Sequence, residues 1–216
     1  MNEDINCNNK RLYVDYNGII TDKSYSVLVK NIEFALRTFS FNEIYFCLSS
    51  GGGNVNAGLE IYSYFKNLKN ISVIMHGYSY IGSIANIIFL SGNKRYATSN
   101  CTFLLHGISQ PLNGQFSTNQ LDEILSNMRQ DEDRLQKIYL DNTKLTDNEI
   151  KDLFQSGKAK NTQYAKEKEI IIEEKEYLTD IKEPKIMFIS TEEIKPNGLI
   201  MRDIQTIYFG LPQPSI

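Results

Sequence analysis

Short apolar runs alternate with helix-like segments through the first half of this chain, and no other feature constrains its fold as strongly. The runs at 42–50 and 71–77 are continuously apolar, as strands buried on both faces are. The segments 24–37 and 56–68 place apolar residues at helical spacing. Strand, helix and strand in succession are typical of right-handed β-α-β units. The sequence therefore predicts an α/β domain.

Further elements extend this pattern on either side. A strand is expected at 11–20, and a buried helix at 83–90 ends at Ser91-Gly92. Two short strands are expected at 95–97 and 102–106. A length of 216 residues suits one large domain, so we expect a polar segment at 1–10 followed by a single domain over 11–216.

The clearest helix is expected over 117–141, where Ser117 and Gln120 form a capping-box pattern. A helix this long projects beyond a compact domain, so its apolar stripe is expected to pack on another subunit; packing across its own sheet is the alternative. The segment 145–154 predicts a second capped helix, so helices occupy 117–155.

The last third of the chain divides into two regions. Residues 158–185 are dense in charge, which is typical of a solvated insertion that is partly mobile. Residues 188–207 return to a pattern of helix, turn and strand.

Composition excludes several classes of function. A net charge of −3 without a Lys/Arg cluster gives no sign of nucleic-acid binding. No apolar run approaches 18 residues, so no membrane span is expected. The widely spaced Cys7, Cys47 and Cys101 form no C-x-x-C pair, so we expect neither a disulfide framework nor a metal site. These features favour a cytoplasmic protein without a cofactor.

The glycine run in SSGGGNV, residues 49–55, stands at a strand-to-helix junction. Consecutive glycines let backbone amides point toward an anion or a developing oxyanion. The run has no Walker Lys-Ser/Thr and no G-x-G-x-x-G. By itself the run is weak evidence, because a plain tight turn is the commoner reason for consecutive glycines.

Serines and histidines near this loop raise the possibility of nucleophilic catalysis. Ser79 and Ser83 lie in the apolar run that follows His76, and His106 ends the strand TFLLH. Each could be a packing serine or a structural histidine. Together with the glycine loop, however, a serine at a buried helix start and a later histidine favour acyl transfer.

The order of these motifs resembles the proteolytic subunit of the Clp protease, in the ClpP/crotonase superfamily. The resemblance rests on SSGGGNVNAGLEIYSYFKNLK, SIANIIFLSGNKRYATSNCTFLLH, GISQPLNGQFSTNQLDEIL, NTKLTDNEI and FISTEEIKPNGLIMRDI. It covers roughly 11–155 and 188–207. It implies a β-α-β superhelix with a protruding long handle helix, and a serine peptidase without a cofactor.

The resemblance also implies site residues. The family's serine falls nine residues before Gly92, at Ser83, but counting four residues forward from Gly77 gives Ile81. The stretch between Gly77 and Ser83 is thus about two residues longer than the pattern, and Ser79 is the second candidate. His106 is the implied base.

An oxyanion hole and an acid complete the implied site. The amides of Gly53 and Ile84 are the implied oxyanion donors. If Phe188 opens the closing segment, the acid's position is Ile186, which cannot orient a histidine. We therefore expect the acid among neighbouring carboxylates, with Asp180 preferred over Glu176 and Glu183.

The leading hypothesis is a chambered peptidase that acts on polypeptides, forms a ring homo-oligomer and works with an ATP-dependent unfoldase. A non-catalytic ring subunit, mixed with an active paralogue, is the alternative that the missing acid and irregular spacing favour. The match to the handle helix and the position of the histidine argue against a crotonase-type acyl-CoA enzyme. A Ser-Lys peptidase would need a buried lysine, and Lys69 and Lys94 are more simply surface residues.

Overall fold

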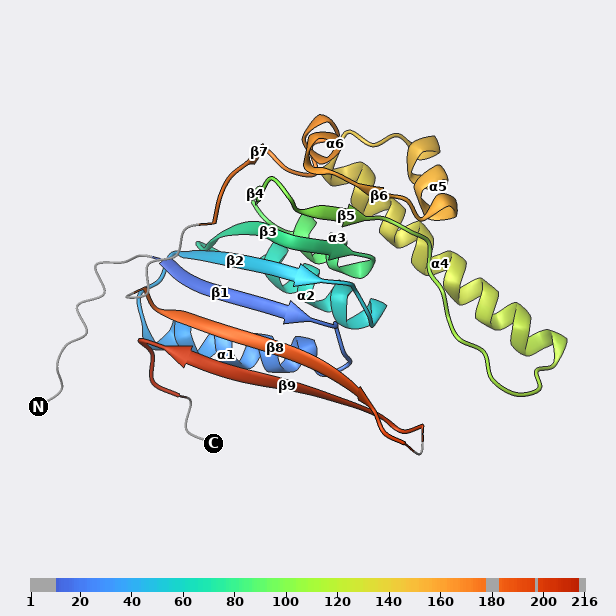
Figure 1. The fold of residues 1–216 in the computed structure, drawn as a ribbon, viewed down its shortest axis with the longest axis horizontal. Coiled ribbons are helices and arrows are strands. Elements are labelled where there is room, and N and C mark those ends of the chain that lie inside the picture. Colours follow the sequence, from blue (N-terminus) through green and yellow to red (C-terminus); the bar gives the residue numbers. More distant parts are fainter. Residues whose placement is uncertain (1–10, 178–182, 197, 214–216) are drawn as a thin grey trace, which may run out of the picture.

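A computed structural model describes residues 11–177, 183–196 and 198–213. Its sheet has the strand order β6-β5-β3-β2-β1-β8-β9, and β4 pairs with both β3 and β7 (Figure 1). The strands are β1 (Arg11–Gly18), β2 (Glu43–Ser50), β3 (Ser72–Gly82), β4 (Lys94–Ala97), β5 (Thr102–Leu104), β6 (Ala159–Lys160), β7 (Glu173–Glu174), β8 (Lys185–Ile194) and β9 (Ile200–Phe209). The helices are α1 (Ser24–Thr38), α2 (Val55–Asn67), α3 (Ile84–Leu90), α4 (Thr118–Asn142), α5 (Asp147–Ser156) and α6 (Thr162–Glu167).

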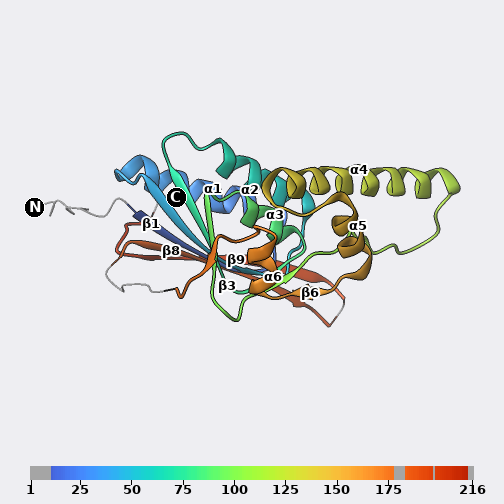
Figure 2. The ribbon, with the colours of Figure 1, turned by 90° about the horizontal axis from the view of Figure 1, so that it is seen from above.

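The predicted α/β alternation is confirmed. β1, β2, β3, β4 and β5 pair in parallel, and only β6 and β9 run antiparallel to their neighbours. Helices α1, α2 and α3 lie on one side of the sheet (Figure 2). Alternate residues of each strand face these helices, as Val73 and Met75 of β3 do, and they form the main core. The parallel strands therefore end at a common edge, where their following loops meet.

Strand β3 contains an irregularity just before its end. Leu48 of β2 pairs with Gly77, but Ser50 pairs with Ile81. Two steps along β2 thus correspond to four along β3, which is the signature of a bulge holding two extra residues. This bulge accounts for the extra length between Gly77 and Ser83 that the sequence indicated.

Helix α4 buries only part of its length. Leu135 and Tyr139, in its C-terminal half, are buried in the core, whereas Leu121 and Leu125 are 38% and 46% exposed. The N-terminal half extends away from the sheet (Figure 1). The predicted capping box of Ser117 and Gln120 is present. The helix therefore packs on its own domain at one end and presents unpartnered leucines at the other.

The charge-dense region is not a solvated insertion over its described first part. Ala165, Ile170 and Ile171 are buried in the main core. The guanidinium of Arg95 donates to the carbonyls of Ile170 (2.8 Å) and Glu169 (2.8 Å) and to that of Asn142 (2.9 Å). The expectation of a solvated segment is wrong here, because the buried isoleucines fix it to the domain.

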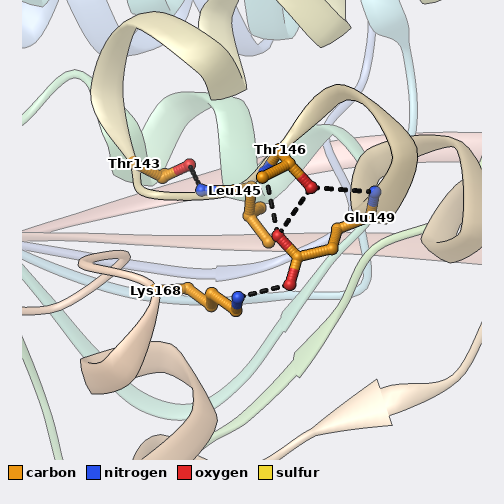
Figure 3. Close-up of polar contacts among 5 residues, drawn as sticks. All are labelled: Thr143, Leu145, Thr146, Glu149 and Lys168. Carbon is orange, nitrogen blue, oxygen red and sulfur yellow. Dashed lines mark hydrogen bonds and ion pairs between the residues drawn. The ribbon is translucent and has the colours of Figure 1, made fainter.

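A polar cluster joins α5 to the end of α6 (Figure 3). Thr146 caps α5 in a reciprocal capping box with Glu149, and Leu145 donates its amide to the Thr143 hydroxyl (3.1 Å). Lys168 forms an ion pair with Glu149. The Lys168 ammonium, aided by the Thr146 donors, lowers the pKa of Glu149 to about 2. Glu149 thus stays ionised and links the two segments at ordinary pH.

The expected helix within 188–207 is also wrong. Residues 185–194 form β8, which pairs in parallel with β1 and antiparallel with β9 over its whole length. The alternation of buried Ile186, Phe188 and Ser190 shows why: one face of this segment completes the sheet. Tertiary pairing therefore overrides the helix that was expected in this segment.

Candidate active site

The loops at the carboxyl edge of the sheet enclose a pocket of about 200 Å³. Ser83 and His106 both line it, although they come from different strand ends. The glycine loop, α3, α4 and the loop after β5 supply the rest of its wall: Gly51, Gly53, Val55, Ile84, Gly107, Ile108, Ser109, Leu135 and Tyr139. Four of the five predicted site residues are thus brought to one pocket.

Ser83 stands at the turn between β3 and α3 in a strained conformation. Its φ of 52° and ψ of −130° are values that non-glycine residues rarely adopt. Its amide donates to the carbonyl of Leu104 (2.8 Å), which ties the turn to the strand leading to His106. A sharp strand-to-helix turn of this kind exposes a serine hydroxyl at the top of the sheet in α/β-hydrolases.

Asn86 holds this turn from inside the protein. Its side-chain amide lies within hydrogen-bond distance of three carbonyls, those of Ile81 (3.1 Å), Ser83 (3.1 Å) and Leu104 (2.9 Å). Sequence analysis did not single out this residue. The signal was present, because a buried amide inside the apolar run IANIIFL must find polar partners.

The glycine loop packs directly against the Ser83 turn. A Cβ on Gly52 would lie 2.5 Å from the Ser83 Cβ, and the φ of Gly52 is +101°. The carbonyl of Gly52 and the amide of Asn54 both bond to Ile20, at 2.8 and 2.7 Å. The amide of Gly53 lies between these two bonds and has no acceptor among the described residues. It is therefore free to receive an external oxygen.

His106 lies two residues beyond β5 and is half-buried. Its Nδ1 is 2.6 Å from the carbonyl oxygen of Gly107. Because a carbonyl only accepts, Nδ1 must be the donor, which leaves Nε2 unprotonated in the neutral ring. A histidine in this tautomer can act as a base through Nε2.

The other candidates lie outside this pocket's wall. His76 is fully buried, with its Nδ1 2.7 Å from the Tyr45 hydroxyl. Burial, with a smaller contribution from the Lys175 ammonium, lowers the pKa of His76 to about 4, so the ring is neutral at pH 7. Ser79 lies exposed within β3. These placements favour a structural role for His76 and leave Ser83 as the serine beside a histidine.

The proposed acid, Asp180, lies outside the described residues. Of its alternatives, Glu176 accepts a hydrogen bond from Ser99 (3.3 Å). Tyr177 packs on Tyr45 and His76, on the sheet face opposite α1, α2 and α3. Within residues 11–177, 183–196 and 198–213, no hydrogen bond joins a carboxylate to His106.

Two wider properties of the described chain bear on its chemistry. No group of His, Cys, Asp and Glu side chains in it has the arrangement of a metal site. None of its helices combines the length and apolar character needed to cross a membrane.

A second hollow, of about 440 Å³, adjoins the Ser83 pocket. The two share Gly53, Val55, Ile108 and Ser109. Its outer wall includes Met128 of α4 and Arg202 of β9. An extended chain could therefore run past Ser83 between α4 and the edge of the sheet.

Comparisons with known proteins agree with this geometry. A family model described as Clp protease matches residues 5–173. A solved structure of a ClpP1 mutant from Listeria monocytogenes aligns with a TM-score of 0.65 and 21% sequence identity, over 76% of this chain and 91% of that chain. At this identity, the structural likeness establishes the fold alone.

The extent of the family match alters one expectation. The family match runs through 158–173, which was expected to be part of an insertion. It ends before 188–207, which was expected to be the closing segment of the family. The acid was sought by counting back from Phe188, which lies outside the match. That count therefore has no support from the family model.

Proposed function

Because the chain belongs to the Clp protease family, we propose that it is a serine endopeptidase subunit that hydrolyses peptide bonds through an acyl-enzyme. One observation carries this proposal: Ser83, in its strained turn, shares a pocket with His106. Strain of this kind persists only where the surrounding structure holds it, and here Asn86 and Gly52 do so.

The reaction follows from the placement of these groups. His106 Nε2 takes the proton of Ser83 Oγ as that oxygen bonds to the substrate carbonyl carbon. The amides of Gly53 and Ile84 receive the resulting oxyanion; Ile84 is the first residue of α3, so its amide has no acceptor within the helix. The C–N bond then breaks as His106 returns the proton to the leaving amine. Water repeats the sequence and releases the acyl group.

The pocket walls favour polypeptide substrates with an apolar side chain beside the bond that is cut. Val55, Leu135 and Tyr139 contribute apolar surface to the pocket. We propose that access to this site is controlled by ring assembly and by a separate ATP-dependent unfoldase. The exposed leucines of α4 support the assembly, because they form an apolar stripe with no partner in the described chain.

The assembly can be tested by placing charge on this stripe. Leu125→Glu combined with Met128→Glu should weaken subunit association about 100-fold, because each change removes apolar burial worth about 1–3 kcal/mol. Sedimentation velocity over a dilution series measures this directly. Gln130→Glu, on the exposed surface of the same helix, adds charge outside the stripe and serves as the control. An unaltered profile in the double variant would exclude α4 as the interface.

The peptidase proposal is tested by a fluorophosphonate probe, which reacts with activated serines. We expect one adduct by intact mass in the wild type and in Ser79→Ala, and no adduct in Ser83→Ala. Loss only in Ser79→Ala would move the nucleophile into β3. A well-folded protein without any adduct would refute the peptidase assignment.

An inactive ring subunit that assembles with an active paralogue is the second candidate. The observation that favours it is the partner of His106, which is a backbone carbonyl where a triad has a carboxylate. The two candidates differ in the probe experiment, because only an active subunit forms the adduct. Mixing the chain with an active paralogue and following sedimentation would then test the structural role.

A further inference from the structure

The immediate surroundings of His106 contain a glycine where a side chain would contact the ring. Gly157 follows α5 with φ 55° and ψ 35°, a left-handed conformation. Among the residues that the structure describes, a Cβ built on Gly157 would have one neighbour within 4 Å, the Cβ of His106 at 3.8 Å. The position beside His106 is thus sterically open to a side chain and lacks one.

A carboxylate that contacts this loop is already engaged. Glu132 of α4 accepts a hydrogen bond from the amide of Ile108 through Oε1 (2.9 Å). The same oxygen would lie 2.6 Å from a Cβ on Gly107. Glu132 therefore holds the backbone that follows His106, while the His106 ring itself bonds to the Gly107 carbonyl.

The geometry points to the carbonyl of Gly107 as the group that takes the place of the triad acid. This inference rests on the proposed function, and it assigns Gly107 a positioning role. The carbonyl keeps the proton on Nδ1, so that Nε2 can act as the base. Being neutral, it sets the tautomer without supplying the negative charge that a carboxylate gives to the imidazolium. The site is therefore a serine-histidine dyad, with an open position for an acid at Gly157.

The tautomer can be measured without substrate. The chain has only two histidines, so long-range ¹H–¹⁵N spectra contain two imidazole rings, and His106→Gln assigns one by its disappearance. We expect the proton on Nδ1 of His106. A ring protonated on Nε2 would overturn the inference. This readout does not depend on activity, so it separates a failure of this inference from a failure of the peptidase proposal.

Two variants test whether the carboxylate of Glu132 or that of Asp180 is the true partner of His106. Glu132→Gln keeps an acceptor for Ile108 and removes the charge, and Asp180→Asn removes the charge of the residue first expected as the acid. In both variants we expect the proton to stay on Nδ1 of His106. We also expect the rate of probe labelling to change less than twofold. A shift of the tautomer or a loss of labelling in either variant would assign the role to that carboxylate instead.

Placing a carboxylate at position 157 tests whether the site lacks only an acid. Gly157→Asp and Gly157→Asn suit a left-handed position about equally well and differ only in charge. Three titratable groups lie close by: Glu132 bonds to the amide of Ile108, Tyr139 lines the same pocket, and Lys158 follows position 157 in the chain. Burial raises the pKa of Tyr139, which stays neutral. We expect Gly157→Asp to raise the acidic limb of the kcat/KM pH profile by about one unit and kcat about tenfold.

The asparagine variant provides the matched control. It should leave both the pH profile and kcat within twofold of the wild type. Equal behaviour of the two variants would show that position 157 is not an open acid site. If Gly157→Asp alone moves the profile, the dyad lacks only the charge that this position can supply.

Discussion

Alanine in place of Ser83 is expected to lower kcat/KM for peptide hydrolysis about 10⁴-fold or more, because the substitution removes the hydroxyl that is proposed to form the acyl-enzyme. The side chain lines the pocket with His106, and its loss removes the nucleophile without disturbing the turn, whose hydrogen bonds are made by backbone atoms and by Asn86. Hydrolysis of a fluorogenic peptide under steady-state conditions measures the change.

Ser79→Ala is the matched control for this substitution. Ser79 is exposed in β3 and does not line the pocket, so its loss should leave kcat/KM within twofold of the wild type. Circular dichroism and sedimentation of both variants should match the wild type. Undiminished hydrolysis by Ser83→Ala would eliminate Ser83 as the nucleophile, whatever the behaviour of Ser79→Ala.

Gly52→Ala is expected to have the second largest effect, on both stability and labelling. The new methyl group would lie 2.5 Å from the Ser83 Cβ and 2.9 Å from the Gly82 carbonyl, at a φ of +101°. Relieving this overlap must move either the glycine loop or the Ser83 turn. We expect a loss of about 2–4 kcal/mol in the free energy of unfolding, and no probe adduct.

Gly51→Ala provides an unusually close control. A Cβ on Gly51 has nothing within 4 Å, and its φ is not positive. The free energy of unfolding should change by less than about 0.5 kcal/mol, and labelling should persist. Denaturant unfolding of both variants shows whether the destabilisation is specific to the contact at Gly52 or follows any alanine substitution in the loop. Equal destabilisation by the two alanines would contradict the packing described for Gly52.

Sequence reasoning succeeded where a local pattern and the tertiary structure favour the same element. The alternation of apolar runs predicted β2, α2 and α3 close to their observed bounds, because these segments form the core. The Ser117 cap predicted the start of α4 for a similar reason: its hydrogen bonds are all local. Local signals of this kind need no knowledge of distant partners.

Both errors arose because burial and strand pairing depend on distant parts of the chain, which the local sequence does not reveal. Segment 158–185 was judged by its average charge, which conceals the buried Ile170 and Ile171. The segment 188–207 was expected to begin with a helix, but β8 pairs with β1 and β9, and neither pairing is visible in the segment itself. Because the acid's position was counted back from Phe188, Gly157 was not considered; its place beside His106 depends on how α5 ends.

The bulge in β3 has a consequence for how such sites are recognised. The bulge holds two extra residues between Gly77, which is paired with Leu48, and the turn at Ser83. Two extra residues are thus accommodated in this strand while Ser83 still lines the pocket with His106. Counting forward from Gly77 by the family's spacing gives Ile81, whereas counting back from Gly92 gives Ser83, the residue that lines the pocket with His106. Where a bulged strand leads into a strand-to-helix turn, the helix that follows is the more reliable reference for locating the serine in the sequence.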